Sequence, residues 1–143
     1  MGFVCETGRD AAPKGARRVR VLAVDDAPMN LELMAAMLEA VGYELAFAAN
    51  GAEAVERAEA EAYDLILMDL QMPVMDGTTA ARRIRASEGP NAATPIVAVT
   101  GHVSQDHIDA CADAGMDDHI AKPFSVSSLV VKAAHWAGRQ RVA

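Results

Sequence analysis

Short apolar runs, each rich in β-branched residues, alternate with longer stretches whose apolar residues recur at helical spacing. This alternation occurs five times after residue 18. An order of strand, helix and strand is typical of βαβ units, in which parallel strands form a sheet and helices cover it. The pattern therefore predicts an α/β fold with a parallel sheet of five strands and five helices. The predicted strands are residues 19–24, 43–48, 64–68, 95–99 and 118–121.

Residues that favour helix ends separate these elements. Pro28 suits the first turn of the first helix, because proline lacks the N–H that would have no partner there. Gly42 is placed to end that helix in a left-handed conformation. The predicted N-caps of the other four helices are Asn50, Asp76, Ser104 and Ser125. The stripes predicted to face the sheet are Leu31, Met34, Met37, Leu38 and Val41 in the first helix and Val126, Leu129, Ala133 and Trp136 in the last.

Composition narrows the class of protein. The 143 residues suffice for one domain, and the 52% of hydrophobic residues can fill its core. Only 4% of the residues are aromatic, so the core must be largely aliphatic. A net charge of −7 argues against nucleic acid as a partner, and no apolar run approaches the ~20 residues of a membrane span. Cys5 and Cys111 lack metal-ligand spacing and are typical of reduced cytoplasmic thiols. We predict a flexible arm at residues 1–18, one domain at 19–138 and a short tail at 139–143.

Polar side chains stand where four of the predicted strands end. Asp25 and Asp26 follow the first strand, Asp69 the third, Thr100 the fourth and Lys122 the fifth. The carboxyl ends of parallel strands lie at one edge of the sheet, so these side chains are expected to converge. Three carboxylates, a hydroxyl and an ammonium together form a site suited to Mg²⁺ and a phosphoryl group.

The chemistry of phosphoryl transfer gives each of these groups a role. Asp69 is the candidate nucleophile, since a carboxylate can accept a phosphoryl group as an acyl phosphate. Asp26 and Asp69 are the expected direct ligands of Mg²⁺, with Asp25 holding a bound water and the Gln71 carbonyl completing the shell. The close carboxylates should raise one another's pKa when no cation is present. Lys122 can pair with Asp69 and then, like the Thr100 hydroxyl, with a phosphoryl oxygen.

Four stretches of sequence carry a more specific signal: VLAVDD at 21–26, LILMDLQMPVMDG at 65–77, PIVAVT at 95–100 and DDHIAKPF at 117–124. Together they resemble the receiver domain of two-component response regulators, over residues 19–137. The resemblance implies a doubly wound, flavodoxin-like fold with strand order 2-1-3-4-5. It also implies that Asp69 accepts a phosphoryl group from a phosphohistidine on a sensor histidine kinase or phosphotransfer protein. A cis peptide bond between Lys122 and Pro123 is a further implication.

The sequence departs from the family pattern beside the predicted site. Gly101 replaces the usual alanine after Thr100, and it should preserve access for the phosphoryl group while loosening the loop. His119 occupies the position of an aromatic residue that moves inward on phosphorylation, and a histidine there could respond to pH. His102 is a candidate for tuning the lifetime of the acyl phosphate. The role of His119 in switching and the effect of His102 on that lifetime stay open from sequence.

These features lead us to predict a stand-alone response regulator that is no enzyme beyond catalysing its own phosphorylation and dephosphorylation. Phosphorylation would alter the face formed by the fourth helix, fifth strand and fifth helix, which would bind a downstream protein or a second copy, or the phosphoryl group would pass onward in a relay. One alternative is the receiver module of a hybrid histidine kinase. A phosphatase with an aspartate nucleophile is disfavoured, because Gln71 stands where a second acid is typical. A phosphate-independent binding module is disfavoured because every group of the site is present.

Overall fold

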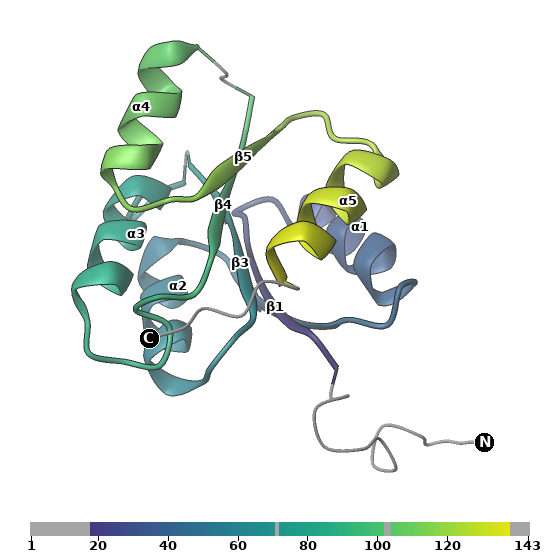
Figure 1. The fold of residues 1–143 in the computed structure, drawn as a ribbon, viewed down its shortest axis with the longest axis horizontal. Coiled ribbons are helices and arrows are strands. Elements are labelled where there is room, and N and C mark those ends of the chain that lie inside the picture. The colour runs from purple at the N-terminus through teal and green to yellow at the C-terminus, as the bar shows by residue number, and fades with distance from the viewer. Residues whose placement is uncertain (1–17, 71, 102–103, 138–143) are drawn as a thin grey trace.

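A computed structural model describes residues 18–70, 72–101 and 104–137 (Figure 1). Five strands alternate with five helices along the chain, as the sequence pattern predicts. None of the described helices has the length and apolar character needed to cross a bilayer. The elements are β1 (Arg20–Val24), α1 (Pro28–Glu39), β2 (Glu44–Ala48), α2 (Gly51–Ala60), β3 (Leu65–Asp69), α3 (Gly77–Ala86), β4 (Ile96–Thr100), α4 (Gln105–Asp113), β5 (Asp118–Ala121) and α5 (Val126–Ala137).

The five strands form one parallel sheet in the order β2-β1-β3-β4-β5. This is the flavodoxin-like order predicted from the family resemblance. Helices α1 and α5 cover one face of the sheet, and α2, α3 and α4 lie on the other (Figure 1). All five strands therefore direct their carboxyl ends to the same edge, which brings together residues far apart in the sequence.

The core consists of two apolar layers, one on each face of the sheet. Successive residues of β1 alternate between them: Leu22 and Val24 join the layer beneath α2 and α3, whereas Val21 and Ala23 join the layer beneath α1 and α5. Every residue of β3 and β4 is buried. Strands covered by helices on both faces need apolar residues at every position, which explains their continuous apolar sequences.

The predicted helix starts are confirmed in the structure. The side-chain oxygens of Asn50 and Asp76 each accept a hydrogen bond from the backbone N–H three residues later, at 2.9 Å. Ser104 and Ser125 accept equivalent bonds, at 3.4 and 3.0 Å. Pro28 opens α1, which has no side-chain cap. These bonds give partners to N–H groups that the helices themselves leave unpaired.

Some details of the predicted boundaries and faces are wrong. Val41 is 47% exposed and Val126 is 56% exposed, although both were expected to face the sheet. Val41 lies beyond the end of α1, where the chain turns through Gly42 at a φ of 93°. Val126 is the first residue of α5, and the first buried residue of that helix is Leu129. The strands β3 and β4 each extend one residue further than predicted and include Asp69 and Thr100.

One arginine joins three segments at the amino ends of β4 and β5. Arg85 of α3 donates hydrogen bonds to the carbonyl oxygens of Gly115, Thr94 and Ala92, at 2.8, 2.7 and 3.1 Å. It also pairs with the carboxylate of Asp117 at 2.9 Å. The same Asp117 oxygen accepts the backbone N–H of Ile96 at 3.0 Å, so the guanidinium fixes both strand starts to α3.

Candidate functional site

Three carboxylates gather at the carboxyl edge of the sheet. Asp25 and Asp26 follow β1, Asp69 ends β3, and these strands are neighbours with Val24 paired to Met68. Each residue offers one carboxylate oxygen, and these three atoms lie within 4.8 Å of one another. Asp25 and Asp69 are buried, whereas Asp26 is exposed. We call these three residues the acidic site; its all-oxygen donor set fits a hard divalent cation such as Mg²⁺.

Lys122 supplies positive charge to the acidic site. Its Nζ atom lies 3.0 Å from Asp69 Oδ1, as the sequence predicts, and also 3.1 Å from Asp25 Oδ2, which the sequence did not suggest. The Lys122–Pro123 peptide bond is cis, as the family resemblance implies. The Lys122 N–H donates to the carbonyl of buried Thr100 at 2.8 Å. Two adjacent strand ends thus place Lys122 beside the carboxylates and Thr100 next to Lys122.

Asp25 is held by more donors than the sequence indicated. Its Oδ1 accepts the backbone N–H of Ala27 at 2.9 Å, and its Oδ2 accepts the Asn30 amide at 3.1 Å as well as Lys122. Sequence reasoning missed Asn30. The available signal was a short polar residue in the first turn of the helix that directly follows the two aspartates.

Burial and charge act against each other at this site. Burial raises the pKa of Asp69 above its ordinary value; the hydrogen bond and charge of Lys122 oppose this, and the charges of Asp25 and Asp26 add to it. The predicted repulsion between carboxylates is thus present at Asp69, although burial is the larger cause. Burial by itself would lower the pKa of Lys122, but its bonds to Asp69 and Asp25 outweigh that effect and raise it. The ion pairs with Lys122 therefore favour the charged form of Asp69, although burial has the larger effect on its pKa.

Two glycines shape the loop that leaves Asp69. A Cβ on Gly77 would overlap the Asp69 carbonyl oxygen, and a Cβ on Gly51 would overlap the Met75 carbonyl oxygen. The N–H groups of these glycines donate to Leu70 and Met75, at 2.9 and 3.1 Å. Only residues without a side chain permit such close approach, so these glycines fix the path of the loop.

The remaining predicted residues have varied outcomes. Gln71 and His102 lie outside the described residues, as do residues 1–17 and 138–143, so the predictions for them stay predictions. A Cβ built on Gly101 meets nothing within 4 Å, which agrees with the expectation that either small residue fits. His119 is half-buried in β5, and its backbone N–H donates to the Asp118 carboxylate at 2.8 Å.

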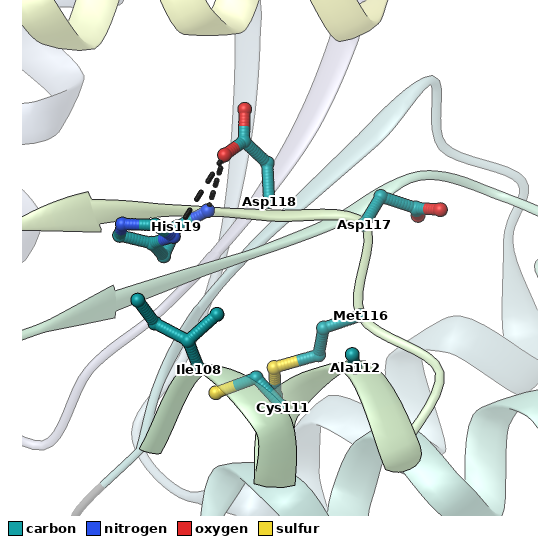
Figure 2. Close-up of a pocket in the computed structure, with 7 residues that line it drawn as sticks. All are labelled: Ile108, Cys111, Ala112, Met116, Asp117, Asp118 and His119. Carbon is teal, nitrogen blue, oxygen red and sulfur yellow. Dashed lines mark hydrogen bonds and ion pairs between the residues drawn. The ribbon is translucent and has the colours of Figure 1, made fainter. Parts of the chain in front are cut away.

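The predicted output face has a pocket of its own, away from the acidic site. Its volume is about 250 Å³, and it lies between α4 and β5 (Figure 2). On the other side of β5, Asp118 accepts hydrogen bonds from Lys132 at 2.8 Å and from Trp136 at 2.9 Å, which tie α5 to the strand. The residues lining the pocket are Ile108, Cys111, Ala112, Met116, Asp117, Asp118 and His119.

Sequence comparison assigns the family. The family model described as the response regulator receiver domain matches residues 21–134, which is most of the chain. The chain belongs to the response regulator receiver family. Its flavodoxin-like fold and two-component signalling class therefore agree with the prediction made from sequence.

Individual relatives are similar over most of this chain. It is 41% identical over 128 residues to the sensor protein GacS of Pseudomonas syringae pv. syringae, covering 88% of this chain and 14% of GacS. It is 42% identical over 109 residues to the histidine-protein kinase BarA of Escherichia coli K12, covering 76% of this chain and 12% of BarA. The chain thus spans about an eighth of the length of these kinases.

Solved receiver structures share the fold. The receiver domain of the sensor histidine kinase PA1611 from Pseudomonas aeruginosa PAO1 is 40% identical with a TM-score of 0.79, over 85% of this chain and 99% of that one; it was solved with a magnesium ion coordinated in its active-site cleft. The chemotaxis protein CheY4 of Vibrio cholerae is 29% identical with a TM-score of 0.79, over 83% and 98% of the two chains.

Proposed function

We propose that this receiver domain accepts a phosphoryl group on Asp69 from a phosphohistidine donor. The observation that carries the proposal is the position of Lys122 Nζ, within 3.1 Å of both Asp25 and Asp69 and beside a third carboxylate. Such an arrangement of a buried nucleophile, a fixed cation and spare carboxylates suits the transfer of a highly charged group.

In the proposed reaction an Asp69 carboxylate oxygen attacks phosphorus. The new bond joins Asp69 oxygen to phosphorus, the bond from phosphorus to the imidazole nitrogen breaks, and that nitrogen keeps the electron pair and takes up a proton. Lys122 favours the ionised form of Asp69 beforehand and then pairs with a phosphoryl oxygen. The hydroxyl of Thr100, at the end of the neighbouring strand, donates to another oxygen of the product.

The acidic site is the proposed position of Mg²⁺, with Asp26 and Asp69 as direct ligands and the Gln71 carbonyl beside them. When bound, the ion would neutralise charge on the phosphoryl oxygens and the carboxylates. Asp25 already accepts hydrogen bonds from three donors, which suits a role in holding a metal-bound water. The magnesium ion in the cleft of the PA1611 receiver supports this proposal.

The proposed partners follow from the reaction and from the family. A cytoplasmic histidine kinase or phosphotransfer protein would supply the phosphohistidine, and a downstream protein or a second copy would read the face of α4, β5 and α5. Through such contacts the domain acts as a signalling module, with no catalysis beyond its own phosphorylation and dephosphorylation.

We retain two contexts for the receiver. A stand-alone regulator is the context predicted from sequence. The second candidate is a receiver module of a hybrid histidine kinase, and it is favoured by the 41% and 42% identity to segments of GacS and BarA. The chemistry proposed at Asp69 is the same in both.

The test is incubation of the full chain with acetyl phosphate and Mg²⁺, followed by intact mass measurement. We expect one added phosphoryl group in the wild type. Labelling should be absent in Asp69→Asn and strongly reduced by a chelator. Labelling of Asp69→Asn at the wild-type rate would refute the assignment. Continued multiple turnover of a small phosphate ester would instead favour the phosphatase alternative.

A further inference from the structure

Val74 has a backbone conformation that is unusual for its side chain. Its φ is +72°, and the N–H of Met75 donates to the carbonyl of Pro73 at 2.7 Å across it. A three-residue hydrogen-bonded turn with a positive central φ is a γ-turn of the rare, strained kind. A β-branched residue is poorly suited to that region, which glycine and asparagine occupy more readily.

The surrounding structure enforces this conformation. Met72 and Met75, on either side of the turn, pack against the apolar layer beneath α2 and α3. Gly51 and Gly77 hold the loop by the close backbone contacts described above. The turn between these anchors must project away from the core, and Val74 is at its tip. Strain that persists because its surroundings impose it is a feature of functional loops.

The Val74 side chain gains little from the protein itself. It is 80% exposed, the highest value among the large hydrophobic residues of the described chain. The next most exposed is Met29 at 79%, in the first turn of α1, which follows Asp25 and Asp26. The two most exposed large hydrophobic side chains of the described residues thus belong to the segments that follow β1 and β3 at the acidic site.

A protein that delivers a phosphohistidine to Asp69 must cover this edge of the sheet. The loop of Val74 starts directly after Asp69, and its Met75 carbonyl contacts Gly51, which begins α2 at the same edge. We propose that Val74 is an apolar docking contact for the phosphohistidine-bearing protein. The anchored loop tolerates the strained conformation because it holds this apolar side chain in a fixed position for the partner. This inference rests on the proposed function of Asp69.

The experiment compares small and protein phosphodonors on the full chain. Val74→Asn keeps a residue that tolerates positive φ but removes the apolar surface, and Val74→Ile keeps both the apolar surface and the strain. Val131→Asn is the matched control, because Val131 is 65% exposed on α5. The small donors are acetyl phosphate and phosphoramidate. The protein donors are the autophosphorylated kinases GacS and BarA.

Val74→Asn should raise the melting temperature by several degrees, because strain is relieved. Its labelling by the small donors should equal that of the wild type, and transfer from the protein donors should fall about tenfold, as for a truncated interface contact. Val74→Ile and Val131→Asn should keep wild-type transfer.

An equal fall with small and protein donors, unchanged transfer in Val74→Asn, or no transfer from either kinase to the wild type would each overturn the docking proposal. Wild-type labelling by the small donors would still support Asp69 as acceptor.

Discussion

Replacement of Lys122 with methionine should slow labelling by acetyl phosphate about a hundredfold, the loss typical of removing one group that stabilises developing charge. In a chelator it should also lower the free energy of unfolding by about 2 kcal/mol, since removal of one partner leaves buried charge uncompensated. The affected carboxylates are Asp25 and Asp69, which are 1% and 5% exposed. Methionine keeps most of the side-chain volume, so the effect isolates the ammonium.

The stability deficit of Lys122→Met should shrink as the pH is lowered. The pKa of Asp69 is already raised by burial, and loss of Lys122 raises it further. A folded-state pKa above the unfolded value destabilises the fold at higher pH, and this cost disappears once the carboxyl is protonated. Chemical denaturation at several pH values measures the trend.

Lys132→Met is the control, because Lys132 pairs with Asp118 on α5 and should not affect labelling. Wild-type labelling in Lys122→Met would exclude the proposed role of the ammonium.

Replacement of Arg85 with alanine should lower the free energy of unfolding by about 3 kcal/mol and the melting temperature by roughly 10 °C. The substitution leaves three carbonyl oxygens and the Asp117 carboxylate without their shared donor. Both partners of the ion pair are about one-fifth exposed, so solvent replaces these bonds only in part.

Arg83→Ala tests whether the loss is specific, because Arg83 is an exposed arginine on the same helix. Its change in stability should stay within about 0.5 kcal/mol. Thermal unfolding followed by circular dichroism compares the two variants. Equal effects of the two substitutions would show that Arg85 does not join the segments as described.

The fold and the centre of the site were predictable because each depends on a local pattern. The apolar strands fix which residues are buried, and the parallel topology then places Asp25, Asp69, Thr100 and Lys122 at one edge whatever their spacing in the chain. The caps at Asn50 and Asp76 were likewise readable, since a cap depends only on residues three positions apart.

Features that depend on distant partners were not predictable in this way. Arg85 meets Asp117 across 32 residues. The topology brings Lys122 to the edge that holds Asp25, but it does not predict that Lys122 Nζ lies 3.1 Å from Asp25 Oδ2. Neither contact has a local signature in the sequence, because each depends on how the loops turn. The positive φ of Val74 was hidden for the related reason that local preference argues against it. Only the packing of Met72 and Met75 and the close glycines account for it.

The acceptor role of Asp69 is tested most directly by locating the phosphoryl group. After phosphorylation by acetyl phosphate with Mg²⁺, borohydride reduction converts the acyl phosphate to homoserine, and peptide mass spectrometry identifies the residue that carried it. We expect homoserine at position 69 alone. Homoserine at position 25 or 26 with an unmodified Asp69 would contradict the assignment.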